Sequence, residues 1–283
     1  MWRGWHKFTE EYFDAMASVP STFPSSSSAG AQPVVDPDGK PLFALVLDDL
    51  IGDDAMTRVL REAEGAGFEE AMMNTGDVSQ EKGQLDTGSR QSRRAIFTST
   101  SLAEELWTVL EPHMPPAEVV PGPRWRGWRA VGVNPRLRVL QYSETDHFEV
   151  HMDGSYSNRS QPPHAKARTE ANEDDKDDDK EEELQKSFLT LQVYLNDGGG
   201  RDFAGGCTRL ITPVGGVQKK RKSPEAAPEP EQIDAATAFD TCDVVPRRGR
   251  VLTFQHNIWH EGERITRGTK LVLRTEIMFA QRA

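Results

Sequence analysis

The chain has 283 residues, of which 36% are hydrophobic, and a formal net charge of −11. It is long enough for one large β domain with helical additions or for two modest domains. No extended basic face is visible that would attract nucleic acid or anionic lipid, and two cysteines are too few for a disulfide framework. No apolar run is long enough to span a membrane. We therefore expect a cytoplasmic protein with no membrane or nucleic-acid partner, of unknown oligomeric state.

Composition changes divide the chain into three parts. Residues 1–34 combine a short amphipathic helix with a tether rich in Ser, Pro and Ala. Residues 35–130 are expected to form a support region of strand and helix, and residues 131–283 a β-rich domain that holds the site. Two polar insertions, 155–186 and 214–240, interrupt this domain and are predicted to be disordered.

Two helices are expected in the support region. The first covers 55–64, with Asp53 or Asp54 as its N-cap and glycines after it. The second is indicated by a capping-box pattern, Ser101-x-x-Glu104, ahead of an apolar run.

The second half of the chain has the period of β-strands. Residues 187–196 and 270–279 each alternate between apolar and polar side chains, which predicts a sheet with one apolar and one polar face. Further strands are expected at 42–47, 136–142 and 250–254. Together they predict a mainly β fold with flanking helices (α+β), a jelly-roll barrel of the double-stranded β-helix or cupin-like kind, with a site at its mouth.

Two histidines and one aspartate form a candidate metal site. His151 and Asp153 lie two apart at a strand end, so their side chains point the same way, and His260 ends another strand. Two imidazoles and one carboxylate on one face of a metal leave adjacent positions open, as non-haem Fe(II) oxygenases require. His147 and His256 each lie four residues before a proposed ligand, but their flanks are strands, so both are left out.

Three charged segments are expected to be exposed. Residues 165–186 hold ten carboxylates and five basic groups, about half of the net charge, and the acidic run 170–183 within them is expected to be a solvated spacer unless it binds a basic partner. KKRK at 219–222 is either a nuclear import signal or a basic patch in a linker. Arg90, Arg93 and Arg94 in SRQSRR are expected in a solvated loop.

Four sequence blocks in order carry a family resemblance. They are GVNPRLRVLQY, F-x-x-H-x-D from Phe148 to Asp153, TLQVYLND followed by FAGGCT, and H-x-G at His260 with GTK ten residues beyond. Over roughly residues 132–279 the chain resembles the prolyl 4-hydroxylase-like branch of the 2-oxoglutarate/Fe(II) oxygenases. The resemblance implies a dioxygenase that hydroxylates a C–H bond, with peptidyl proline as the leading substrate, and that releases succinate and CO₂.

The resemblance also implies roles for the site residues. The two histidines and the aspartate would bind Fe(II), with 2-oxoglutarate and O₂ as co-substrates and L-ascorbate as a reductant. Lys270 would pair with the far carboxylate of 2-oxoglutarate, and Tyr142 and Tyr194 would line its pocket. Arg274 shares the face of Lys270 and is the rival cation, while Thr190 is a weaker candidate. No catalytic residue is expected beyond the metal centre.

Two alternatives stay open. One is a non-catalytic module on the same fold that binds 2-oxoglutarate or a protein. The other is an oxygenase that acts on a small metabolite instead of a protein or peptide.

The chain departs from the family pattern in the separation of the two histidines. His151 and His260 are 109 residues apart, longer than in compact members of the family, and the two insertions account for the excess.

Overall fold

The computed structural model describes residues 34–35, 41–71, 90–114, 127–158, 184–213 and 239–281. The expected N-terminal helix and tether, the acidic run and the KKRK segment lie outside these ranges. The ends of the two predicted insertions are described: 155–158 and 184–186 flank one gap, and a strand begins at 239. Among the described helices, none is long and apolar enough to cross a bilayer.

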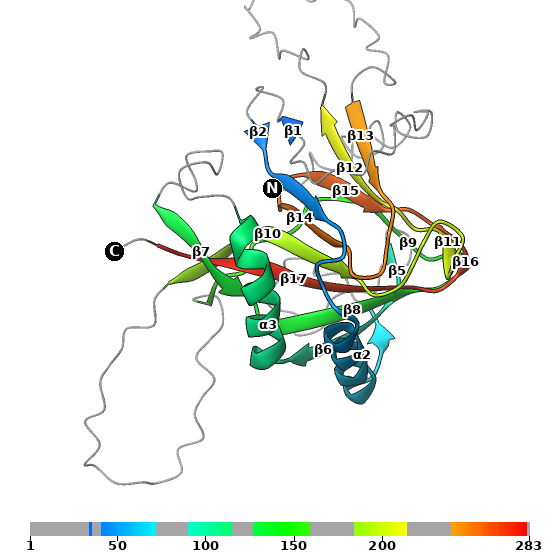
Figure 1. Cartoon of the computed structure of the whole chain (residues 1–283). Coiled ribbons are helices and arrows are strands. Elements are labelled where there is room, and N and C mark those ends of the chain that lie inside the picture. Colours follow the sequence, from blue (N-terminus) through cyan, green and yellow to red (C-terminus); the bar gives the residue numbers. More distant parts are fainter. Residues whose placement is uncertain are drawn as a thin grey trace, which may run out of the picture.

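The larger of two main sheets has eight strands within the described residues, all paired antiparallel (Figure 1). In spatial order they are β3 (Ala44–Leu47), β14 (Val251–Gln255), β10 (Gln185–Tyr194), β17 (Lys270–Gln281), β8 (Arg136–Tyr142), β6 (Arg93–Thr98) and β4 (Glu69–Glu70), with β7 (Trp128–Val133) also on β17.

The smaller sheet has five described strands. They are β13 (Phe239–Val244), β12 (Thr208–Pro213), β15 (Trp259–Gly262), β9 (His147–His151) and β5 (Arg90–Gln91). Two further antiparallel pairs join β11 (Phe203–Gly205) to β16 (Ile265–Gly268) and β1 (Val34–Val35) to β2 (Pro41–Leu42). Two antiparallel sheets that face each other confirm the predicted mainly β jelly-roll fold.

Helices cover the outer face of the large sheet. In β10, Leu189, Leu191 and Val193 are fully buried in a core shared with helices α2 (Asp53–Ala66) and α3 (Thr100–Leu110), and Figure 1 shows both helices against this sheet. Each such side chain contributes about 1.5–3 kcal/mol of burial free energy. The polar residues of the alternation therefore face the small sheet, as predicted.

The helix starts differ from those predicted. Gly52 is the N-cap of α2 and Ser99 that of α3, and neither makes a side-chain capping hydrogen bond. Asp53 and Asp54 lie in the first turn of α2, where carboxylates favour the positive end of the helix dipole. The predicted caps were wrong, although both helices exist and Gly67 ends the first.

The basic segment ahead of the core is not a loop. Arg90 lies in β5 at the edge of the small sheet, and Arg93 and Arg94 begin β6 in the large sheet. The segment therefore passes from one sheet to the other, and the expectation of a solvated loop was wrong.

Candidate metal centre and cavity

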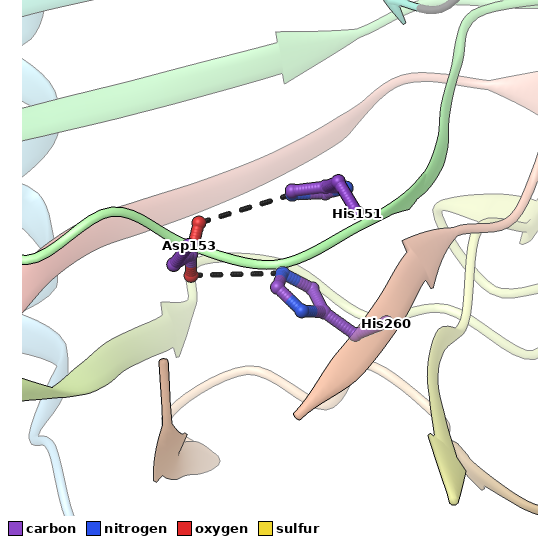
Figure 2. A group of neighbouring side chains, drawn as sticks. All are labelled: His151, Asp153 and His260. Atoms are coloured by element: carbon purple, nitrogen blue, oxygen red, sulfur yellow. Dashed lines mark ion pairs between the residues drawn. The ribbon is translucent and has the colours of Figure 1, made fainter. Parts of the chain in front are cut away.

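Three side chains converge at one point beside the small sheet (Figure 2). His260 in β15 lies directly opposite His151 in β9. Opposite residues of an antiparallel pair project from the same face, and the two ring centroids are 4.2 Å apart. Asp153 is two residues beyond His151 and projects to the same side. One ligand atom from each residue lies within 4.8 Å of the others, so the structure brings the predicted trio together.

Each imidazole is held through its Nδ1 atom. His151 Nδ1 donates to the carbonyl of Glu149 at 2.7 Å, and His260 Nδ1 donates to that of Ile258 at 3.0 Å. Because a carbonyl oxygen only accepts, Nδ1 carries the hydrogen and Nε2 keeps a lone pair. Burial lowers the pKa of His151 to about 3 and also lowers the pKa of His260. Both rings are therefore neutral at pH 7, the form that binds metals.

The Nε2 atoms face the carboxylate of Asp153 without a hydrogen between them. The distances are 3.8 Å from His151 to Oδ1 and 3.6 Å from His260 to Oδ2, along the dashed lines of Figure 2. With neutral imidazoles these are contacts between lone pairs, which repel unless a cation lies among them. Two imidazoles and one carboxylate suit a divalent first-row metal such as Fe(II), so the residues fit the predicted ion.

Residues of the large sheet hold Asp153 in place. The Arg274 guanidinium lies 2.5 Å from Oδ1, and the Thr190 hydroxyl donates to Oδ2 at 2.5 Å. Burial acts to raise the pKa of Asp153, but Arg274, the two histidines and the hydrogen bond from Thr190 together outweigh it, and the pKa lies well below its ordinary value. The carboxylate is thus ionised at neutral pH, as a metal ligand must be.

A second histidine supports Asp153 from behind. The Thr190 hydroxyl donates its hydrogen to Asp153, so its oxygen is left to accept a hydrogen bond from His256 Nδ1 at 3.0 Å. With Nδ1 as the donor, His256 Nε2 accepts from the Ser187 hydroxyl at 2.9 Å. His256 is therefore a partner of a candidate ligand, a role that spacing did not predict. The alternation of β14 carried a signal: Leu252 and Phe254 belong to the core cluster between the sheets, and His256 continues their face.

A cavity of about 450 Å³ opens beside the three candidate ligands. Strands of both sheets line it, among them β8, β9, β15 and β17, so it lies between the sheets as the predicted site at the barrel mouth requires. Tyr142, Lys270 and Arg274 all line this cavity.

Lys270 is a buried cation without an anionic partner. Its side chain is 4% exposed, and its Nζ donates to the carbonyl of Gly206 at 2.7 Å. Within the described part of the chain, no carboxylate lies within 4 Å of it. Burial lowers the pKa of Lys270 to about 8, partly offset by Cys207 and Glu263. Such a charge is costly to bury, and an entering carboxylate would stabilise it.

The two predicted pocket tyrosines flank this lysine differently. Lys270 Nζ lies 5.6 Å from the ring centroid of Tyr142 and 5.5 Å from that of Tyr194. Tyr142 lines the cavity, whereas Tyr194 is fully buried and donates its hydroxyl to Thr208 at 2.8 Å. Thr208 in turn donates to Gln192 at 3.1 Å. Thr208 and Gln192, not predicted as site residues, line the cavity in its place.

Comparisons with known proteins gave structural matches only. No protein-family model matches the chain, and no curated protein sequence matches it. Among solved structures, the chain is similar to a prolyl-4-hydroxylase from Pseudomonas putida, at 12% identity over 84% of this chain and 92% of that one, with a TM-score of 0.46. It is also similar to a prolyl hydroxylase from Trichoplax adhaerens, at 12% identity over 84% and 83%, with a TM-score of 0.45. A third match is a 2OG-Fe(II) oxygenase family protein from Burkholderia pseudomallei, at 11% identity over 84% of each chain, with a TM-score of 0.41.

Proposed function

We propose that this protein is an Fe(II)- and 2-oxoglutarate-dependent dioxygenase that hydroxylates a C–H bond and releases succinate and CO₂. The observation that carries the proposal is the meeting of His151, Asp153 and His260 with their lone pairs directed at one point. A structural zinc site would use four protein ligands, usually with cysteine. Three ligands on one side leave room for a bound co-substrate, which favours a reactive centre.

The unpaired lysine supports 2-oxoglutarate as that co-substrate. A dicarboxylate bound near the candidate ligands would bring its far end into the barrel, where Lys270 is buried and has no carboxylate partner among the described residues. Arg274, the rival cation, is already paired with Asp153 and, at 3.4 Å, with Glu276. Lys270 is therefore the better candidate, with Tyr142 beside it.

The protein residues would act by position and charge. His151, Asp153 and His260 would hold the ion, and Thr190 and Arg274 would fix the carboxylate ligand. When bound, Fe(II) supplies the oxygen chemistry that no side chain can perform.

The proposal is tested by succinate formation from purified full chain with Fe(II), 2-oxoglutarate and O₂. We expect His151→Ala to lose this activity at least a hundredfold, because two ligands hold the ion poorly. His113→Ala is the matched control, since His113 is exposed and lies outside the cavity. Binding of 2-oxoglutarate with no turnover in either wild type or variant would instead support a non-catalytic module.

The substrate proposed first is peptidyl proline, on the strength of the sequence resemblance. L-Ascorbate is proposed as the reductant that restores oxidised iron. Both are tested by mass spectrometry of peptides incubated with the enzyme, with and without ascorbate. Addition of one oxygen atom to proline supports the proposal, and oxygen on another residue or on a small metabolite replaces it.

A further inference from the structure

Arginines crowd one part of the cavity although the chain as a whole is acidic. Among the described residues, five arginines line it, against three carboxylates, in a protein whose net charge is −11. The five are Arg90, Arg94, Arg136, Arg138 and Arg274, and the carboxylates belong to Asp153, Glu261 and Glu276. A local excess of positive charge in such a chain calls for a specific explanation.

The inner two arginines are paired within the protein. Arg138 lies 2.7 Å from Glu276, and Arg274 contacts both Glu276 and Asp153. Glu276 also accepts from Asn134. This group is charge-balanced and buried, so it holds the wall of the cavity and needs no further anion.

The outer three are Arg90, Arg94 and Arg136, which we call the rim arginines, and of these Arg94 pairs with Glu69 at 3.7 Å. Within the described ranges, neither Arg90 nor Arg136 has a carboxylate within 4 Å. Arg90 lies over the Phe148 ring at 4.6 Å and donates to Ser92. Burial lowers the pKa of Arg94, and the positive charges of Arg90 and Arg136 lower it further, so both of those guanidinium groups repel Arg94.

The rim arginines are distinct from the co-substrate end of the cavity. The charged groups that act on Lys270 are Cys207 and Glu263, and no arginine is among them. Arg90 instead packs on Phe148, whose ring stacks on His151 at a centroid distance of 3.6 Å. The cavity thus has one cation for the co-substrate and a separate group of cations, of which Arg90 packs on the ring that stacks against a candidate metal ligand.

From this arrangement we infer that the substrate carries a carboxylate or phosphate group that binds to Arg90 and Arg136. The inference rests on the proposed function, because it concerns what is oxidised at that site. Guanidinium groups bind both oxyanions through paired hydrogen bonds, and these bonds strengthen in a half-buried cavity. Anion binding would relieve the repulsion among the rim arginines and would orient the substrate beside His151.

The test is titration calorimetry of the full chain with two probes, inorganic phosphate and N-acetylglycine. Each is titrated without metal and with Mn(II) plus saturating 2-oxoglutarate. We expect wild type to bind at least one probe with a millimolar dissociation constant, and Arg90→Gln/Arg136→Gln to bind it at least tenfold more weakly. The probe that binds with the lower dissociation constant identifies the substrate's anionic group as phosphate or carboxylate.

Two variants serve as controls. Arg58→Gln/Arg201→Gln removes the same charge from exposed positions outside the cavity and should change the affinity less than twofold. Lys270→Met tests whether the probe occupies the co-substrate end instead. If the arginine double variant does not fold, as judged by its melting temperature, Arg136→Gln alone carries the test, because that side chain is exposed.

The inference is overturned if neither probe binds, if the arginine variants bind as wild type does, or if only Lys270→Met loses binding. Succinate formation separates this result from the proposed function. Succinate formation without probe binding would remove the anion site and keep the oxygenase. Probe binding at the rim arginines without succinate formation would remove the oxygenase and keep the anion site.

Discussion

Two cations of one strand, Lys270 and Arg274, illustrate how partners decide the role of a residue. Both line the cavity from β17, four residues apart and on the same face. Arg274 lies 2.5 Å from Asp153 and supports a candidate ligand. The ammonium group of Lys270 donates to a backbone carbonyl and lies near two aromatic rings, and among the described residues no carboxylate lies within 4 Å of it. An incoming anion would therefore give Lys270 the ionic partner that it lacks among the described residues.

The requirement for 2-oxoglutarate should depend on the charge of Lys270. Burial lowers the pKa of Lys270 from its ordinary value to about 8, so the side chain is charged below pH 8 and neutral above it. Since only the charged form attracts a carboxylate, KM for 2-oxoglutarate should be flat up to about pH 8 and rise about tenfold per pH unit above it. Steady-state kinetics between pH 6.5 and 9.5 measure this.

Substitutions at Lys270 and Arg274 test which of the two side chains binds 2-oxoglutarate. Lys270→Arg stays charged over the whole range and should abolish the rise in KM above pH 8. Lys270→Ala should raise KM for 2-oxoglutarate more than Arg274→Ala does, while Arg274→Ala should mainly weaken metal binding. A larger rise in KM for Arg274→Ala would show that the arginine binds the co-substrate.

At the scale of elements, strand β10 connects the core to the candidate metal centre. Its odd-numbered residues from Leu189 to Val193 pack under the helices, while Thr190 on the opposite face donates to Asp153 and accepts from His256. The pairing of β10 with β14 keeps Thr190 opposite Phe254, near His256. The position of the metal ligand thus depends on the register of the large sheet.

Thr190→Val should therefore weaken metal binding without unfolding the barrel. The variant keeps the shape of the side chain but removes the hydrogen bond to Asp153 and leaves His256 without an acceptor. Loss of such a supporting contact typically costs 10–100-fold in metal affinity, which Mn(II) titration would measure.

The neighbouring strand offers a matched control. Thr253 in β14 is also fully buried, and within the described residues its hydroxyl has no hydrogen-bond partner. Thr253→Val should leave metal affinity unchanged and should not lower stability. Equal losses of metal affinity in both variants would mean that Thr190 acts through packing alone.

Strands could be predicted where burial of one face imposes a regular alternation of apolar and polar residues. The alternation in 187–196 and 270–279 predicted β10 and β17 because one face of each packs against helices. The caps could not be predicted, because adjacent residues such as Gly52 and Asp53 compete for one position and no side-chain bond selects between them. Short strands such as β5 leave too few residues for any period.

The candidate ligands were predicted on other grounds. His151, Asp153 and His260 were proposed from residue type and spacing together with the family resemblance, but their meeting depends on the β9–β15 register, which only the structure supplies. Arg90 and Arg94 were misplaced because a cavity wall is polar, so hydrophobic periodicity does not distinguish it from a solvated surface. The contacts of His256 with Ser187 and Thr190 depend on two strands that are far apart in the sequence, so spacing did not indicate them.

At the scale of the whole molecule, the candidate metal centre links the two sheets. His151 and His260 belong to the small sheet, whereas Asp153 is held by Thr190 and Arg274 from the large one. An ion bound to all three ligands would connect the sheets across the cavity. An ion that binds the folded chain and not the unfolded one raises the free energy of unfolding by RT ln(1 + [L]/Kd), where [L] is the concentration of free ion.

Mn(II), used because it stays reduced during the measurement, should therefore raise the melting temperature of the protein. At a hundredfold excess over its dissociation constant the gain is about 2.7 kcal/mol, which corresponds to roughly 5–10 °C for a domain of this size. A thermal scan with Mn(II), and again after addition of EDTA, measures it. His260→Ala should lose the shift, because the ion then keeps ligands only from the β9 side and no longer ties that segment to β15. His113→Ala should keep it, and a full shift in His260→Ala would place the ion elsewhere.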